Sequence, residues 1–397
     1  MFTYVNLLQI HHVYICKICF DYICKMNITD IDLINDWYDL NYQHKIIGRW
    51  VRTAQILPLI KELSPFFEVN KIGESFLKND IYKISFGKGK RKILIWSQMH
   101  GNESTGTKAL FDLFKFFETN AVKNRLVADI LKECTIVCIP ILNPDGAEAY
   151  TRVNAEEIDL NRDVIDKKAV ESTILQDILI EENPEYCFNL HDQRTIFSVG
   201  KENNPATISF LAPSVDKERS ITKGRIQTMK VIMDMNNVLQ NYIPGHIGRY
   251  TDEFYPTATG DNFQKMGHNT ILIESGHFKD DYQREKTRKY TFLSLFIGIQ
   301  SISKPSSNDN IDAYFEIPCN DKNYYDIIVK SVSFQGKKVD IGILFEEKIV
   351  NSKLQFIARL DKIKNLSNYN ANMLIHKPNL TFSSKKELKK WINTEFN

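Results

Sequence analysis

The sequence predicts an α/β protein with a mixed, largely parallel central sheet flanked by helices, and a small β-rich domain at the C-terminal end. The first observation behind this prediction is that short apolar runs, typical of buried strands, alternate with longer segments of helical periodicity. The second is that the alternation stops near residue 304, where a polar segment begins. The third is an ordinary globular composition, with 43% hydrophobic and 25% charged residues in a chain of 397 residues.

The elements of the first half follow from this pattern. Two strands separated by a polar turn are predicted at 66–72 and 80–86, and a buried strand is predicted from Ile93 to Trp96. A helix is expected over 103–120, where Leu110, Leu113 and Phe117 recur at helical spacing. The next apolar run, at 135–142, predicts a strand that ends in the turn sequence 143–146, Asn-Pro-Asp-Gly.

The same alternation continues to residue 303. Helices are predicted at 169–181, 220–242 and 286–303, and strands at 186–190 and 270–273. Residues 304–310, rich in Ser, Asn and Pro, are a predicted linker. We therefore expect an α/β domain over 26–303 and a small β-rich domain over 311–397, with a helix near 385–395.

Residues 1–25 differ in character from the rest of the chain. They hold Cys16, Cys19 and Cys24 together with His11 and His12. A single Cys-x-x-Cys pair is a weak zinc signal when no second pair follows. The alternative interpretation is a disordered or mis-assigned leader, with translation starting at Met26.

Charge and cysteine content indicate which partners and which cellular location to expect for the protein. Lys and Arg together number 51, against 49 for Asp and Glu, so we expect neither nucleic acid nor a membrane surface as a partner. The most apolar stretch, 291–302, is far shorter than the roughly 20 residues that span a bilayer. Seven scattered cysteines predict reduced thiols in a cytoplasmic protein.

Polar side chains follow the predicted strands at the points where they end. His100 and Glu103 follow the strand 93–97, His191 follows 186–190, and Glu274 follows 270–273. Ligands of open α/β sheets bind beyond the carboxyl ends of the strands. Two imidazoles and one carboxylate are the ligands of an open, hydrolytic zinc site, and Glu274 is available as a general base.

Each of these residues also has a purely structural interpretation. A lone histidine at a strand end is more often a hydrogen-bonding residue than a metal ligand, and Glu274 could be the partner in a buried ion pair. Asn161 could cap a helix, and Arg162 could be a surface charge. The ordered combination is what favours a site.

The combination resembles the zinc carboxypeptidases, the carboxypeptidase A-like metallopeptidases, over roughly residues 60–300. The resemblance rests on five motifs in order: His100-Gly101-Asn102-Glu103, Asn143-Pro144-Asp145-Gly146, Asp159-Leu160-Asn161-Arg162, Asn189-Leu190-His191 and Ile273-Glu274. It implies a carboxypeptidase-like fold for 26–303 and a short cytosolic, bacterial-type member of the family. It also implies a metallocarboxypeptidase that hydrolyses the C-terminal peptide bond through a zinc-activated water.

The resemblance assigns roles to single residues. His100, Glu103 and His191 would hold one zinc ion per chain, and Glu274 would be the general base. Site roles are further implied for Arg152, which would stabilise the oxyanion, for Asn161 and Arg162, which would bind the substrate carboxylate, and for Asp159, which would orient His100.

Some points stay open. Tyr250 and Tyr255 are both candidates for the tyrosine that the family places over its site, and the stretch 259–262 is expected near the specificity pocket. Arg152 lies closer to Arg162 than the matching arginine of the digestive enzymes. The alternatives are a zinc-dependent deacylase or amidase acting on N-acyl amino acids or unusual peptide linkages, and a degenerate binding module. Oligomeric state is left open.

Overall fold

The computed structural model describes residues 31–307 and 310–396, so the predicted leader with its cysteine pair lies outside the described residues. The chain divides into two compact units, with the boundary between Gln43 and His44. In the first unit, residues 31–41 form a helix in which the rings of Tyr38 and Tyr42 stack with their centroids 5.5 Å apart. All elements below belong to the second unit.

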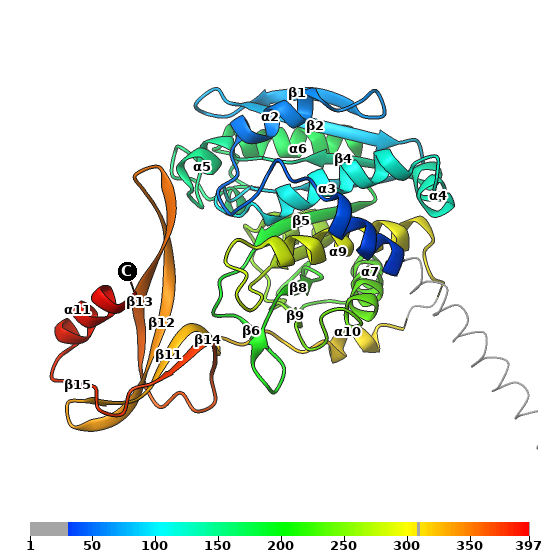
Figure 1. Ribbon diagram of the computed structural model, residues 1–397. Coiled ribbons are helices and arrows are strands. Elements are labelled where there is room, and N and C mark those ends of the chain that lie inside the picture. Colours follow the sequence, from blue (N-terminus) through cyan, green and yellow to red (C-terminus); the bar gives the residue numbers. More distant parts are fainter. Residues whose placement is uncertain (1–30, 308–309, 397) are drawn as a thin grey trace, which may run out of the picture. The chain divides into compact units, whose positions relative to one another are not determined.

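An eight-stranded mixed sheet forms the centre of the second unit in the described part of the chain, in the order β1-β2-β4-β3-β5-β10-β8-β9 (Figure 1). The central pairs β4–β3, β3–β5 and β5–β10 are parallel, whereas β1–β2, β2–β4 and β10–β8 are antiparallel. Its strands are β1 (Glu68–Glu74), β2 (Asp80–Gly87), β3 (Arg91–Trp96), β4 (Cys134–Ile139), β5 (Tyr186–Asp192), β8 (Ile208–Leu211), β9 (Ile247–Arg249) and β10 (Asn269–Ser275).

Helices cover both faces of this sheet. One layer contains α3, α4, α7 and α9, which contact one another, and the other contains α6 and α8. The helices that precede residue 304 are α2 (Thr53–Lys61), α3 (Thr105–Asn120), α4 (Arg125–Glu133), α5 (Pro144–Ala149), the 3-10 helix η1 (Leu160–Arg162), α6 (Val170–Glu182), α7 (Lys223–Leu239), α8 (Thr259–Lys265) and α9 (Glu285–Ser303).

The strands at the centre of the sheet are buried on both faces. Leu94 and Trp96 of β3 pack with Leu175 and Leu179 of α6 and with Phe263 of α8. Side chains alternate between the two faces of a strand, so the neighbouring Ile93 and Ile95, also fully buried, face the opposite helix layer. Burial on both faces explains why these strands read as continuous apolar runs.

The C-terminal segment forms a second sheet with the order β13-β12-β11-β14, and β15 also pairs with β11. Its elements are α10 (Asp312–Glu316), β11 (Tyr324–Phe334), β12 (Lys337–Val350), β13 (Lys353–Lys364), β14 (Asn370–His376), β15 (Thr381–Phe382) and α11 (Lys385–Phe396). Ile327, Ile343 and Ala358 form its core with Leu388 and Ile392 of α11. A separate short pair joins β6 (Ser198–Val199) to β7 (Asn204–Pro205).

The predicted fold class is confirmed, and the differences are local. The strand predicted at 135–142 ends at Ile139, because Pro140 has no N–H to continue the ladder. The predicted helix 103–120 begins at Thr105, so Glu103 lies in the loop before it. Several short elements were not predicted, among them α4, α8 and the strands β8 and β9. These elements are short, so their periodicity is weak.

Candidate metal centre

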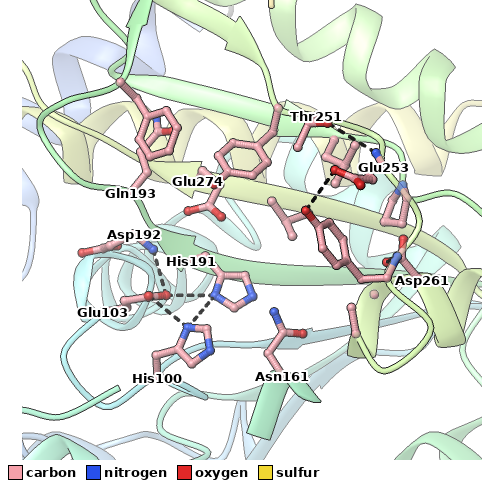
Figure 2. Close-up of a pocket in the computed structure, with 18 of the residues that line it drawn as sticks. His100, Glu103, Asn161, His191, Asp192, Gln193, Thr251, Glu253, Asp261 and Glu274 are labelled. Atoms are coloured by element: carbon pink, nitrogen blue, oxygen red, sulfur yellow. Dashed lines mark hydrogen bonds and ion pairs between the residues drawn. The ribbon is translucent and has the colours of Figure 1, made fainter. Parts of the chain in front are cut away.

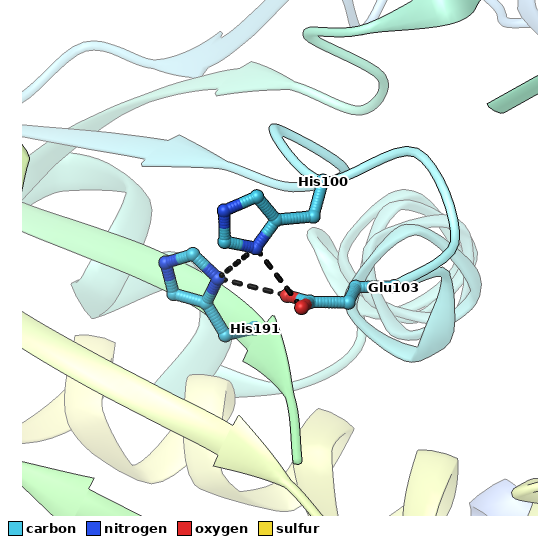
Figure 3. A group of neighbouring side chains, drawn as sticks. All are labelled: His100, Glu103 and His191. Carbon is cyan, nitrogen blue, oxygen red and sulfur yellow. Dashed lines mark hydrogen bonds and ion pairs between the residues drawn. The ribbon is translucent and has the colours of Figure 1, made fainter. Parts of the chain in front are cut away.

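Three side chains from two strand ends meet at one point (Figure 3). Nδ1 of His100 lies 2.9 Å from Oε1 of Glu103, and Nδ1 of His191 lies 2.8 Å from Oε2 of the same carboxylate. The two Nδ1 atoms are 3.1 Å apart. The exposed fractions of the side chains are 1% for His100, 12% for Glu103 and 3% for His191. The structure therefore brings the three predicted metal ligands together.

The parallel centre of the sheet explains this convergence. His100 and Glu103 follow the carboxyl end of β3, and His191 lies near the carboxyl end of the adjacent β5. Gly101 is required between them, since a Cβ atom there would lie 1.9 Å from the backbone carbon of Gly146. The loop from β3 to α3 thus packs directly on the start of α5, which fixes the path of the chain through His100 and Glu103.

The donor set fits a zinc ion. One ligand atom from each of the three residues lies within 4.8 Å of the other two. Two imidazole nitrogens and a carboxylate, aimed at one another and largely screened from water, are the ligand types of a catalytic zinc site with an open position. Imidazole and carboxylate are also harder ligands than thiolates, in keeping with zinc rather than copper(I).

The charges of the three groups shift one another's pKa values. Burial opposes the charged form of His100, but the carboxylates of Glu103 and Asp159 outweigh it and raise the pKa of His100. Burial lowers the pKa of His191, whose interaction with Glu103 only partly offsets it. The imidazoles in turn outweigh burial at Glu103 and hold the pKa of its carboxyl well below the usual range. Glu103 is therefore ionised at neutral pH.

Asp159 and Arg152 lie directly behind the cluster. Oδ1 of Asp159 is 3.0 Å from Nε2 of His100, the nitrogen that faces away from the cluster. Nε of Arg152 donates to Oδ2 of Asp159 at 3.0 Å, and its Nη1 lies 3.2 Å from Nδ1 of His100. A carboxylate on the far nitrogen of a histidine fixes the tautomer and orientation of its ring. By contrast, the buried Nε2 of His191 has no hydrogen-bond partner among the described residues.

Glu274 faces the cluster from the next strand. It pairs in register with His191 across the parallel β10–β5 ladder and lines the same cavity (Figure 2). Burial, reinforced by the nearby carboxylates of Glu103 and Asp192, raises the pKa of Glu274 well above its usual value. A carboxylate that holds a proton more tightly than usual is suited to general acid and base chemistry near neutral pH.

The cavity that these residues line has a volume of about 450 Å³. Asn161 and Arg162, in η1, line it together with Tyr255. The amide oxygen of Asn161 accepts a hydrogen bond from the backbone N–H of Thr259 at 3.1 Å, and the guanidinium of Arg162 lies 5.4 Å from the ring centroid of Tyr255. A planar guanidinium beside an amide donor suits a carboxylate ligand.

Both candidate tyrosines line the cavity. The Tyr255 side chain is partly exposed and its hydroxyl donates to Glu253 at 3.2 Å, whereas the ring of Tyr250 packs on Phe197 at a centroid distance of 5.4 Å. Tyr255 is therefore the less constrained of the two. The stretch 259–262 forms the start of α8, and Gly260 and Asp261 from it reach the cavity.

Several lining residues were not singled out in the sequence. Asp192 follows the predicted ligand His191 directly, and its backbone N–H donates to Oε2 of Glu103 at 3.2 Å. Its position next to His191 was the signal that could have identified it. Arg194 and Lys322 also line the cavity. Lys322 lies far along the chain, just before β11, and no local pattern links it to this site.

Comparison with known proteins agrees with the motifs. Residues 54–183 match the protein family described as zinc carboxypeptidase, a span that includes His100, Glu103 and Asn161 but neither His191 nor Glu274. Carboxypeptidase 2 of Trichophyton rubrum is 26% identical over 117 residues, which are 29% of this chain and 20% of that protein. Carboxypeptidase SOL1 of Arabidopsis thaliana is 36% identical over 69 residues, 17% of this chain and 14% of that protein. The match thus spans a fifth or less of these relatives.

Solved structures extend the similarity to about two thirds of the chain. Carboxypeptidase A from Helicoverpa armigera aligns with a TM-score of 0.52 at 13% identity, over 70% of this chain and 82% of that one. Bovine thrombin-activatable fibrinolysis inhibitor aligns with a TM-score of 0.51 at 15% identity, over 64% of this chain and 97% of that one. The eight-stranded sheet and its helices therefore have the carboxypeptidase-like α/β fold.

One further finding concerns membranes. None of the helices in residues 31–307 and 310–396 combines the length and the apolar character needed to cross a bilayer.

Proposed function

We propose that the protein is a zinc-dependent metallocarboxypeptidase that hydrolyses the C-terminal peptide bond of a peptide. The observation that carries this proposal is the convergence of His100, Glu103 and His191 in a cavity that Glu274 and Arg162 also line. The partial family match and the shared fold support the same activity.

His100, Glu103 and His191 would hold the zinc ion, and Asp159 would keep the His100 ring in place. Zinc at this point supplies a Lewis acid and lowers the pKa of a bound water to about 7. Glu274 would take the proton from the attacking water on its carboxylate and later give it to the leaving amine. Its raised pKa supports both steps, because the carboxyl has to hold that proton between them.

The substrate would be oriented by its own terminal carboxylate. Arg162 and the amide of Asn161 would bind that carboxylate, while Tyr255 lies beside the guanidinium of Arg162 as a partly exposed cover. Arg152, already within 3.5 Å of Glu103, would stabilise the negative charge that develops on the scissile carbonyl oxygen. These positions suit a substrate peptide whose C-terminal residue lies in the cavity.

The proposal also covers the domain organisation, the cellular location and the number of zinc ions. Residues 26–303 would form the catalytic domain and 311–397 an added β-rich domain. The four described cysteines carry free thiols, three of them buried, which supports a reducing, cytoplasmic location for a short member of the bacterial type. A single zinc ion per chain would suffice, since one cluster of ligands was found in the described residues.

The test is a matched substrate panel with the zinc-loaded protein. Each peptide is supplied with a free C-terminal carboxylate and as its C-terminal amide, and N-acyl amino acids are added as a third class. The proposal predicts release of the last residue from the free-acid peptides and little from the amides. Turnover of the N-acyl amino acids alone would favour the deacylase alternative, and no turnover in any class would contradict both.

A further inference from the structure

A carboxylate of the C-terminal sheet contacts two side chains near the loops of the metal centre. Glu347 of β12 accepts a hydrogen bond from the hydroxyl of Tyr150, and its Oε1 lies 2.9 Å from Nη1 of Arg49. The exposed fraction of the side chain is 7% for Arg49 and 26% for Glu347. Both partners belong to the part of the chain that carries the site, whereas Glu347 lies more than 150 residues beyond the zinc carboxypeptidase match.

The first partner leads to the loop that carries Arg152. Tyr150 has a left-handed backbone conformation, φ 57°, which is uncommon for a residue with a side chain and has to be held by its surroundings. The next carbonyl, that of Thr151, accepts the backbone N–H of Asn102 at 3.2 Å, inside the loop between His100 and Glu103. Arg152 follows at once. A fixed Tyr150 therefore fixes this arginine against the metal ligands.

The second partner, Arg49, leads to Asp192, the residue next to His191. Nη2 of Arg49 lies 4.0 Å from Oδ2 of Asp192, a side chain that is only 2% exposed. The backbone N–H of Asp192 donates to Oε2 of Glu103, and the same Oδ2 of Asp192 accepts the hydroxyl of Thr105 at 2.7 Å. The backbone carbonyl of Arg49 also accepts the hydroxyl of Ser104 at 2.6 Å, at the start of α3.

We propose that Glu347 is a positioning residue of the metal centre, through which the C-terminal sheet sets the geometry of the ligands by holding both Tyr150 and Arg49. The two routes are short and involve different elements, so one carboxylate constrains the Arg152 loop and Glu103 together. This inference rests on the proposed metal-dependent function. It gives the C-terminal sheet a part in the site although its own side chains hold no metal cluster among the described residues.

The experiment measures zinc transfer from the full-length, zinc-loaded protein to a chromogenic chelator. The variants are Glu347→Gln, which keeps the shape but removes the charge, and Tyr150→Phe, which removes only the hydroxyl. Glu346→Gln is the matched control, because that neighbour on β12 pairs with the exposed Arg359 and Lys348 instead. We expect zinc loss to be roughly tenfold faster in both test variants, as for other residues that orient metal ligands. The control should lose zinc at the wild-type rate.

Two further readouts separate positioning from a general loss of structure. With zinc in excess, kcat should fall in Glu347→Gln while KM stays within about twofold, because the site is filled but misaligned. The double variant should lose zinc more slowly than the product of the two single effects predicts, since both changes weaken the same contact between Tyr150 and Glu347. Tyr150→Phe remains informative if Glu347→Gln does not fold.

The outcomes are distinct. Zinc retention and kcat equal to those of the wild type in Glu347→Gln and Tyr150→Phe would overturn the inference and leave the proposed function standing. A wild-type protein that takes up no zinc would overturn the proposed function, and the positioning role with it.

Discussion

The two sheets of this protein use polar side chains in opposite ways. In the eight-stranded sheet, the parallel strands β3, β5 and β10 end at one edge, and the side chains at those ends turn toward one another to make a site. In the C-terminal sheet, the neighbouring strands β11, β12 and β13 pair antiparallel, so their ends alternate between two edges. Its polar side chains act one at a time, at contacts with loops of the first sheet.

The C-terminal segment contacts three separate loops of the first sheet. Besides Glu347, the amide of Asn320, in the loop just before β11, donates to Gln193 at 3.0 Å, two residues after His191. Asn372 of β14 donates to Asp280 at 3.1 Å, in the loop that follows Glu274. The comparison indicates that the first sheet gathers the candidate site residues, and that the C-terminal segment contacts the loops near them.

The largest effect should come from removing a metal ligand. His191→Ala should lower activity by at least about 1,000-fold and abolish stoichiometric zinc, because two ligands from one loop do not complete the site. Zinc analysis and a peptide assay check this. His376→Ala, at an exposed histidine of the C-terminal sheet, is the matched control and should leave both unchanged. Equal losses of zinc and activity in the two variants would contradict the claim that only the first sheet carries the metal site.

The next effect concerns the general base. Glu274→Gln should reduce kcat by roughly 10²–10⁴ while zinc remains bound, because the amide cannot accept the proton of the attacking water. Metal analysis beside steady-state kinetics measures the two quantities separately. Unchanged kcat would mean that this carboxylate has no part in proton transfer.

A smaller effect is expected at the carboxylate-binding end of the cavity. Arg162→Gln should raise KM for free-acid peptides by about 10- to 100-fold, the worth of one charge-assisted hydrogen bond of about 1.5–3 kcal/mol. Peptide amides, which lack the terminal charge, serve as the control substrates. If the two substrate classes lost affinity equally, Arg162 would not be reading the terminal carboxylate.

The smallest effect concerns the C-terminal sheet, where the stability of the fold should depend on pH through Asp326. Burial raises the pKa of Asp326 to about 6, in spite of hydrogen bonds from the Phe345 N–H and the Tyr282 hydroxyl. The folded state then binds the proton more tightly than the unfolded chain, so this contribution to stability is complete below about pH 4 and is lost as the pH rises through 6. The loss amounts to at most about 3 kcal/mol.

Asp326→Asn removes that titration. The stability of the wild type relative to the variant should be greatest near pH 4 and should decrease toward pH 7, as measured by thermal unfolding across the range. Taking the difference between the two proteins cancels the titration of the predicted metal ligands. A difference that does not change with pH would show that Asp326 does not titrate in this range.

Much of the first sheet could be predicted from the sequence, because buried parallel strands leave long apolar runs and end in recognisable polar motifs. His100 and Glu103 are close in sequence, and the topology of a parallel sheet is sufficient to expect His191 and Glu274 at the same edge. Residues such as Glu347 could not be predicted in the same way. Its contacts with Tyr150 and Arg49 join segments about 200 and 300 residues away, and such pairings depend on how the two sheets pack.

Short elements were missed for a related reason. The helix α4 has an identifiable start, since the side chain of Asn124 accepts the N–H groups of Leu126 and Val127. Its nine residues give too few turns for periodicity alone to reveal it. Local capping signals therefore add information where the hydrophobic pattern is short.

X-ray absorption spectroscopy at the zinc edge of the full-length protein tests the central claim most directly. The account predicts a first shell of nitrogen and oxygen atoms alone, at about 2.0–2.2 Å, with imidazole scattering that decreases in His191→Ala. A sulfur shell near 2.3 Å would contradict it, because thiolates would then hold the metal in place of the imidazoles and carboxylate at the ends of β3 and β5.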